Sequence, residues 1–484
     1  MVNLREQCAN VHERQKELAN QKAHEILRVA VGRASLAEAV HKKRHRRRPS
    51  ALVIGGGAAG MTAALTIADS GYPVHLVERS AMLGGNLADL YYVAEGHNPQ
   101  QLLRDLVNRV RSHQQIRTYT RAEVIDHRGH VGDFQAVLRV GRGSGEADEV
   151  LIEHGVTVVA TGGQELKQHP LLEIPGIITQ RELETKIIHH PEEIAALKDV
   201  VMIQCVGPHG VAEYCSRVCC TNTLKNATRI KLFNPDCRVV VLYKDIVTYG
   251  FREQYYTEAR KLGVIFFKFS GDRLPPVARD ASSRRLAVSV YDPALGKQLT
   301  LPADLISLSM SAVPSSGTPE LAGMLRVPLS SEGFFQEAQL KLRPMDFMRQ
   351  GIFLAGMAAY PKFIEETISH SLAAAARALP LLSQEAMHLG GVIAVVDPDK
   401  CVGCLTCTRV CPFGIPQVVT ANGTSGVGGL GGAAFIDDAQ CQGCGTCTAE
   451  CPANAIQLVN YRDEQMMLTQ IQGLGAWSAL QAAG

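Results

Sequence analysis

Residues 51–78 read ALVIGGGAAGMTAALTIADSGYPVHLVE, the pattern of a strand, a glycine-rich turn, a helix and a second strand. Together they form a βαβ unit of about 30 residues. Gly55, Gly57 and Gly60 have G-x-G-x-x-G spacing, with Ala59 beside the last of them. In such a turn the first glycine permits the tight bend, the second admits a pyrophosphate, and the third lets the helix pack on the strand. The unit therefore predicts a dinucleotide site, for FAD or NAD alike.

Candidate contacts for the rest of that dinucleotide follow the turn. Glu78 ends the second strand, eighteen residues beyond Gly60, where its carboxylate would accept hydrogen bonds from the adenosine ribose. Arg79 directly follows Glu78, and Gly85 and Asn86 come a few residues later. For this stretch a plain loop is an equal interpretation.

Two later segments favour FAD over NAD. They are VTVVATGG at 156–163 and GIFLAGMAAYP at 351–361. Both resemble the remaining FAD-contact segments of flavoproteins with two dinucleotide-binding domains, such as the thioredoxin reductase family. That family usually has aspartate where this chain has methionine, so the ribityl contact must be made otherwise. The candidate contacts in the two segments are Thr161, Gly162, Gly356 and Met357.

The middle of the chain lacks the second glycine motif that such flavoproteins use for NAD(P)H. Residues 205–210 read CVGPHG at the expected place. We therefore expect no nicotinamide site. A catalytic C-x2-C pair, which a simple disulfide reductase would need, is also missing from the flavin half.

Eight of the fourteen cysteines lie in two similar runs, CVGCLTCTRVCP from Cys401 and CQGCGTCTAECP from Cys441. Both runs match the C-x2-C-x2-C-x3-C-P spacing of two-cluster ferredoxins, in which the fourth cysteine of each run ligates the other cluster. Structural zinc is the alternative for C-x2-C pairs, but two identical four-cysteine runs, each closed by proline, favour iron–sulfur clusters. The predicted ligand sets are Cys401, Cys404, Cys407 and Cys451 for one [4Fe-4S] cluster, and Cys441, Cys444, Cys447 and Cys411 for the other.

A third cysteine group, Cys205, Cys215, Cys219 and Cys220, stands where the nicotinamide motif would be. Four thiolates complete the coordination of a [4Fe-4S] cluster, and a relay near a flavin needs such a centre. Buried free thiols and zinc remain alternatives on spacing alone. Cys237 is isolated in the sequence and is expected to be an ordinary thiol.

The run CVGPHGVAEYCSRVCCTNTLKNA at 205–227, with YKDIVTYGFREQYYTEARKLGVIF after it, resembles the A subunit of CoB–CoM heterodisulfide reductase and its bacterial relatives. NLREQCANVH near the N-terminus and the cysteine-rich C-terminal repeat share this resemblance, which covers nearly the whole chain. It implies FAD in a thioredoxin-reductase-like core with several [4Fe-4S] clusters, the central cysteine group among their ligands. It also places Lys225 near flavin N5, where a cation would stabilise a reduced anionic flavin. A solvated helix lysine is the alternative.

The chain also departs from that family. It starts where long members already have an extended N-terminal domain, and it lacks their inserted ferredoxin module. Cys8 matches a family cysteine and is a candidate ligand of a fourth cluster, with an ordinary thiol as the alternative.

These patterns predict an α/β fold with an α+β ferredoxin domain. Charge is nearly balanced, with 49 Lys+Arg against 47 Asp+Glu, which excludes a global bias towards nucleic acid or an anionic membrane. No signal peptide or membrane span is recognisable, so we expect a protein of a reducing cytoplasm.

The expected parts are a helical segment and basic linker at 1–48, a flavoprotein core at 49–390 (FAD part 51–164 and 346–385, middle part 165–345), the ferredoxin domain at 391–460 and a tail at 461–484.

The expected function is electron transfer between FAD and three [4Fe-4S] clusters in a multi-subunit oxidoreductase. The resemblance implies partners such as the B and C subunits of heterodisulfide reductase or hydrogenase- or dehydrogenase-linked subunits, with the disulfide site on a partner, and allows a homodimer. It also implies that the flavin bifurcates electron pairs in some members. The alternatives are a relay subunit of a quinone-interacting or aromatic acyl-CoA reductase complex, and a redox-sensing module without turnover.

Overall fold

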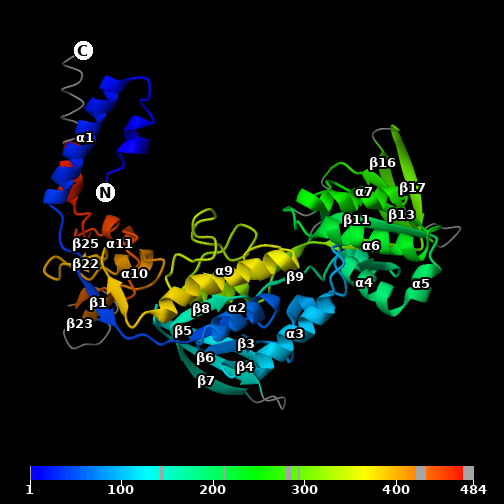
Figure 1. Cartoon of the computed structure of the whole chain (residues 1–484), viewed down its shortest axis with the longest axis horizontal. Helices are drawn as coiled ribbons and strands as arrows, with labels where there is room; N and C mark the ends of the chain where they lie inside the picture. The colour runs from blue at the N-terminus through cyan, green and yellow to red at the C-terminus, as the bar shows by residue number, and fades with distance from the viewer. Residues whose placement is uncertain are drawn as a thin grey trace. The chain divides into compact units, whose positions relative to one another are not determined.

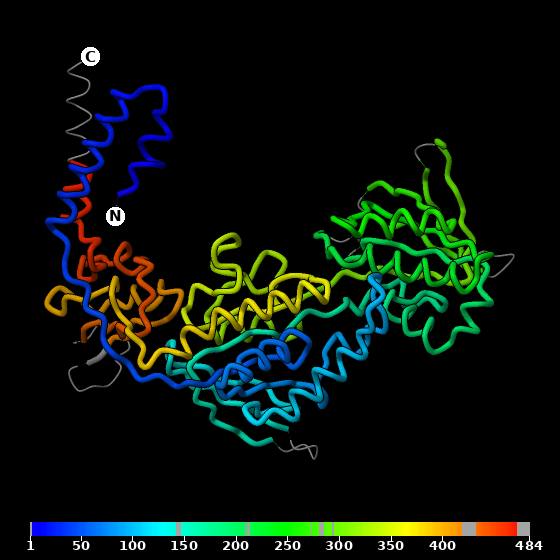
Figure 2. The backbone as a smooth tube through the Cα atoms, viewed as in Figure 1, coloured from blue at the N-terminus to red at the C-terminus, as the bar shows by residue number. Residues whose placement is uncertain are grey.

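The computed structural model describes residues 2–141, 147–208, 210–211, 213–271, 273–279, 285–292, 295–420 and 432–471. The chain forms two compact units, shown as ribbon and tube in Figures 1 and 2. The larger unit is residues 47–385, and the smaller one combines residues 1–46 with 386–484. The part of the expected tail beyond residue 471 lies outside the described residues.

The first half of the larger unit contains a five-stranded parallel sheet in the order β20-β8-β2-β3-β4. Alternate residues of a strand point to opposite faces, so Ala51 and Val53 pack against helices while Leu52 and Ile54 pack against a small antiparallel sheet. Both faces are covered, which explains why the central strands are apolar throughout. The strands are β2 Ala51–Ile54, β3 Val74–Glu78, β4 Ile116–Thr120, β8 Val156–Val159 and β20 Ile352–Leu354.

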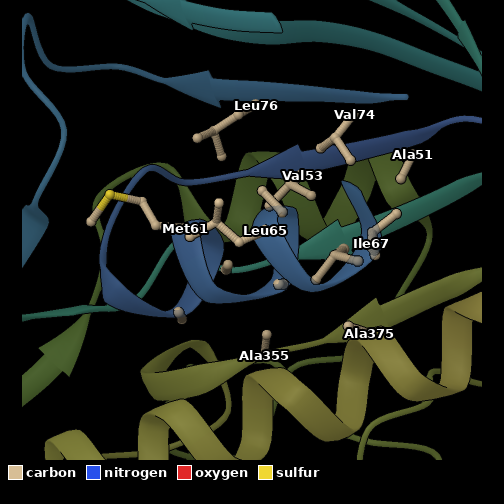
Figure 3. Close-up of a cluster of buried hydrophobic side chains, with 14 of the residues drawn as sticks. Ala51, Val53, Met61, Leu65, Ile67, Val74, Leu76, Ala355 and Ala375 are labelled. Atoms are coloured by element: carbon tan, nitrogen blue, oxygen red, sulfur yellow. The ribbon is translucent and has the colours of Figure 1, made fainter. Parts of the chain in front are cut away.

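Helices α2 (Ala58–Asp69) and α9 (Ile364–Ser383) pack against each other and against this sheet. Figure 3 shows side chains of α2, among them Met61 and Leu65, in one cluster with Val53 and Leu76 of the sheet. Both helices are rich in alanine, which is a good helix former. Its small side chain lets α2 and α9 approach each other closely. The other elements of this half are α3 Pro99–Ser112, the 3-10 helix Gly85–Asp89, and the antiparallel strands β5 Ala122–His130, β6 Asp133–Gly141 and β7 Ala147–His154.

The second half repeats this arrangement around the parallel strands β10-β18-β11-β13-β14. One face packs against helices and the other against three antiparallel strands. Helix α4 begins with a capping box in which Thr179 and Glu182 satisfy each other's backbone N–H groups. The strands are β10 Ile177–Thr179, β11 Asp199–Gly207, β13 Arg238–Tyr243, β14 Ile265–Lys268 and β18 Leu305–Met310, covered by β15 Val277–Arg279, β16 Leu286–Asp292 and β17 Lys297–Ala303, and by helices α4 Gln180–His189, α5 Pro191–Ala195, α6 Cys219–Phe233 and α7 Glu253–Lys261.

Strands β9 (Gly163–Glu165) and β19 (Ala312–Pro314) pair antiparallel where the chain passes between the halves, and α8 (Thr318–Leu325) follows. Where a second glycine turn would stand, β11 instead pairs with the short strand β12 (Gly210–Val211). The repeated sheet architecture confirms the predicted two-dinucleotide-binding-domain class.

The smaller unit contains the cysteine repeat. Strands β22 (Ala394–Val396) and β25 (Ile456–Leu458) form one pair, β23 (Gln417–Thr420) and β24 (Gly432–Phe435) form another, and each half has a short helix, α10 (Thr406–Val410) or α11 (Thr446–Ala449). This is the expected α+β ferredoxin arrangement.

The N-terminal residues of the smaller unit contain helical turns followed by a strand. A single turn of π-helix at Arg5–Ala9 precedes α1 (Lys16–Ser35), which buries none of its side chains. The basic run, expected to be a linker, contains strand β1 (Lys42–His45), which pairs with β21 (Met387–Gly390). Lys43 forms an ion pair with Asp438 (2.5 Å), so part of the basic run is structured.

Candidate flavin and iron–sulfur sites

The glycine turn after β2 has room for glycine alone at two of its positions. A Cβ on Gly55, whose φ is +112°, would lie 2.3 Å from the carbonyl oxygen of Ala160. A Cβ on Gly60 would lie 1.8 Å from the Gly55 carbonyl oxygen. At Gly57 the nearest heavy atom is 3.9 Å away, so the space in front of α2 is open.

This open space lies at the N-terminus of α2, which has no side-chain cap. The first N–H groups of a helix carry partial positive charge and bind phosphate. The hydroxyl oxygen Thr161 Oγ1, at the end of neighbouring β8, is buried without a hydrogen-bond partner among the described residues. An open helix terminus beside an unpaired hydroxyl fits a bound dinucleotide.

Glu78 has structural partners as well as the predicted role. Its Oε2 accepts the N–H of Gly56 and its Oε1 accepts the N–H of Ser80, both at 2.7 Å. Each carboxylate oxygen retains a second lone pair, so ribose contact stays a prediction. Arg79 donates to Ser316 (2.6 Å to Oγ), and Asn86 Nδ2 donates to the carbonyl oxygen of Gly163 (2.7 Å).

A cavity in the larger unit brings four of the predicted residues together. Asn86, Met357, Cys219 and Lys225 line it. The sequence pattern did not identify the rest of its polar lining. Those residues include Gln164, Glu165, Arg181, Glu184 and Lys362.

Lys225 is buried, which rules out the alternative of a solvated helix lysine. Its Nζ donates to the carbonyl oxygen of Tyr92 and to Glu184 Oε2, both at 2.7 Å, and lies 4.7 Å from the centroid of the Tyr92 ring. Burial lowers the pKa of Lys225, while the Glu184 carboxylate raises it. Glu184 is 41 positions away in the sequence, and no local pattern could have identified it.

The four central cysteines come from three places around the second sheet. Cys205 is in β11 with a φ of +60°, Cys215 follows β12, and Cys219 and Cys220 begin α6. Each of the other three influences the pKa of Cys219, which the Cys220 thiol and burial raise. The structure therefore brings all four together.

Backbone donors reach two of these cysteines. The N–H groups of Arg217 and Val247 point to the sulfurs of Cys215 (3.3 Å) and Cys220 (3.4 Å). Backbone N–H groups directed at sulfur are typical of iron–sulfur sites.

Arg217, inside the cysteine loop, joins that loop to the flavin half. Its guanidinium donates to the carbonyl oxygen of Pro361 (3.2 Å), to Tyr249 Oη (2.7 Å) and to Glu366 Oε1 (3.0 Å). An arginine between two predicted ligands was a sequence signal for this role, but its partners are distant in the sequence.

In the smaller unit, the predicted cross-pairing of the cysteines agrees with their placement. One cavity is lined by Cys401, Cys404, Cys407 and Cys451. Burial and neighbouring thiols raise the pKa of Cys447 to about 12. The neighbours of Cys447 are Cys441, Cys411 and Cys444, with Cys407 of the first set also close.

Backbone geometry in this repeat supports the same interpretation. A Cβ on Gly443 would lie 2.3 Å from the carbonyl oxygen of Val392, and a Cβ on Gly403 would lie 2.9 Å from that of Gly432. The N–H of Ala434 points to Cys401 Sγ at 3.3 Å. The tight turn at Gly403 thus lies against β24, whose Ala434 N–H reaches a predicted ligand sulfur.

The two remaining cysteines lie apart from these sets. Cys8 is buried, and its thiol donates to the carbonyl oxygen of Ala19 at 2.8 Å. Cys237 lies in the hydrophobic core under α6. A fourth cluster at Cys8 remains a prediction.

Comparisons with known families agree with this division. Residues 51–171 match the FAD dependent oxidoreductase family, and residues 400–456 match the 4Fe-4S dicluster domain. Together with the fold, these matches define an electron-transferring flavo-iron–sulfur oxidoreductase subunit. None of the described helices has the length and hydropathy needed to cross a bilayer.

Curated relatives specify the family further. One of them, the CoB–CoM heterodisulfide reductase iron–sulfur A subunit 1 of Methanopyrus kandleri, is 32% identical over 571 residues, covering 98% of this chain and 84% of that protein. The corresponding iron–sulfur A subunit of Methanocaldococcus jannaschii is 31% identical, covering 96% and 83%. The chain belongs to the family of heterodisulfide reductase A subunits.

Solved structures similar to this chain are more distant. Thioredoxin reductase of T. acidophilum has 14% identity and a TM-score of 0.45, covering 69% of this chain and 96% of that one. An NAD-dependent persulfide reductase of A. fulgidus has 20% identity and a TM-score of 0.45, covering 72% and 61%.

Proposed function

We propose that this chain passes electrons between FAD in the larger unit and three [4Fe-4S] clusters, two in the ferredoxin repeat and one at the central cysteines. The observation that carries the proposal is the position of Cys219, which lines the same cavity as the predicted flavin contacts Asn86 and Met357. A cluster at this cysteine would be adjacent to a flavin in that cavity.

The residues around the cavity have distinct parts in this proposal. Gly57 and the N-terminus of α2 would hold the pyrophosphate, and Thr161 would donate to the cofactor. FAD, when bound, supplies the chemistry that connects two-electron to one-electron transfer. Lys225 and Glu184 form an ion pair, so together they would place a dipole beside the flavin ring without adding net charge.

The family supports a complex with partner subunits, in which heterodisulfide cleavage takes place on a partner. Flavin-based bifurcation is a separate part of the hypothesis, because it requires strongly crossed one-electron potentials. Stepwise potentiometry of the bound flavin tests it directly.

An anaerobic reductive titration of the full chain tests the electron-transfer proposal. Photoreduction with a deazaflavin should deliver about five electrons per chain, two to FAD and one to each of three clusters. Cys219→Ser should accept about four, with flavin absorbance still bleached. Four electrons in both proteins would overturn the central cluster.

A further inference from the structure

The flavin cavity contains two buried lysines that differ in charge compensation. Lys225 Nζ forms an ion pair with Glu184 at 2.7 Å, and both side chains are less than a tenth exposed. Lys362, also buried, lines the same cavity. Among the described residues, no carboxylate oxygen lies within 4.0 Å of Lys362 Nζ. Within that part of the chain, Lys362 therefore has no counter-ion.

Lys362 is held in place by neutral groups. It follows β20 and the turn that contains Gly356 and Met357. Its Nζ donates to the carbonyl oxygen of Gly356 at 3.1 Å and lies 3.1 Å from the centroid of the Tyr360 ring. A ring face attracts an ammonium group, but it supplies no compensating charge.

Burial and the surrounding charges bring the pKa of Lys362 close to neutral pH. Burial, and after it the charge of Arg217, lowers the pKa of Lys362 to about 7 against the opposing effect of Glu366 and Glu337. His370, whose Nδ1 accepts the Gly356 N–H, has its pKa lowered by burial to about 4 and is neutral at pH 7. The other charged groups around the cavity are Asp89, Glu95, Glu165, Arg181, Glu184, Lys225 and Glu365. All five of these carboxylates are paired with cations other than Lys362: Glu184 with Lys225, Asp89 and Glu165 with Arg181, and Glu95 and Glu365 with Arg252.

We propose that Lys362 compensates the negative charge of the reduced flavin and that its amine takes up a proton when the flavin is reduced. The proposal rests on the flavin occupying this cavity. Two electrons arrive from the clusters, one proton from solvent joins the flavin and leaves it with one negative charge, and a second proton converts the Lys362 amine to an ammonium. Reoxidation returns both protons.

The physical reason is the response of a buried amine to a new charge. An anion favours the charged form of a nearby amine. At an effective dielectric constant of about 20 and a separation of about 6 Å, the proton affinity rises roughly 100-fold. Between about pH 7 and about pH 9 the amine is neutral beside oxidised flavin and protonated beside reduced flavin. Below pH 7 it is protonated in both states.

The pH dependence of the flavin midpoint potential tests this in the loaded full-length protein. Dye-equilibrated titrations from pH 6 to pH 9 should show one proton taken up per two electrons at pH 6 and two at pH 8. Lys362→Arg keeps the charge but does not titrate, so it should take up one proton at every pH. Its reduction equilibrium at pH 6 should stay within about threefold of the wild type.

Lys362→Met removes the charge as well. It should take up one proton throughout, and its reduction equilibrium at pH 6 should be about 100-fold less favourable. Exposed Lys261 on α7 provides the matched control, because Lys261→Met should behave as the wild type.

Two results would overturn the proposal: a one-proton dependence across the range in the wild type, or a two-proton dependence that persists in Lys362→Arg. If Lys362→Met does not retain FAD, Lys362→Arg decides. Failure of the unmodified chain to bind FAD would instead contradict the proposed flavin site.

Discussion

Gly57 and Gly60 have different roles in the glycine turn. Gly57 leaves room for the phosphate and Gly60 allows close packing, so alanine substitutions should have different effects at the two positions. Gly57→Ala adds a methyl group where the nearest heavy atom is 3.9 Å away, so the fold should persist while the methyl obstructs the phosphate position. We expect FAD affinity to fall at least about tenfold, measured by fluorescence titration of the apoprotein.

Gly60→Ala provides the contrast. Its Cβ would lie 1.8 Å from the Gly55 carbonyl oxygen, so this variant should lose folded structure by circular dichroism. A Gly57→Ala variant with unchanged FAD affinity would contradict the placement of the pyrophosphate.

Replacing only one member of the Lys225–Glu184 ion pair should lower the unfolding free energy strongly. Glu184→Gln leaves a buried ammonium without its counter-ion, which costs about 3–5 kcal/mol of unfolding free energy. Replacing both residues, as Lys225→Met with Glu184→Gln, should recover most of that loss. Urea unfolding followed by circular dichroism measures both.

The pair formed by Lys186 and Glu193 is a solvent-exposed control. Exposed ion pairs contribute little, so Glu193→Gln should leave the urea midpoint unchanged. An equal effect of Glu184→Gln and Glu193→Gln would contradict the burial of Lys225.

The loop between β12 and α6 depends on Arg217 for its attachment to the start of α9. Arg217→Ala removes hydrogen bonds to Tyr249, Glu366 and the carbonyl oxygen of Pro361. We expect the fold to persist while the central cluster becomes labile, with iron falling from about twelve towards eight per chain during gel filtration. Arg217→Lys, which keeps one charge, should lose less. Stable retention of twelve irons in Arg217→Ala would contradict this role.

Elements with a local signature could be predicted from the sequence, and elements that depend on distant partners could not. The βαβ unit and the cysteine repeat are defined by residues within short stretches of chain. Strand β1 consists of lysine, arginine and histidine and forms only because β21, some 340 residues later, pairs with it. For the same reason, Glu184 and the partners of Arg217 could not be predicted, because they lie far from Lys225 and Arg217 in the sequence.

In the chain as a whole, the ferredoxin repeat should behave as two interlocked sites. Cys451→Ser removes a ligand from the cavity that holds Cys401, Cys404 and Cys407. Cys411→Ser should affect the other set, because Cys411 lies near Cys447. Each variant should lose about four irons, and electron paramagnetic resonance of the reduced proteins should show that different clusters disappear. Loss of the same signal in both variants would contradict the cross-pairing.

The central claim is that a cluster sits beside the flavin, and iron, sulfide and FAD determined together on anaerobically purified protein test it most directly. We predict about twelve irons and one FAD per chain, about eight irons with FAD retained in Cys219→Ser, and about twelve in Cys237→Ala, whose thiol lies in the core. About eight irons in the unmodified chain, unchanged by Cys219→Ser, would contradict the claim.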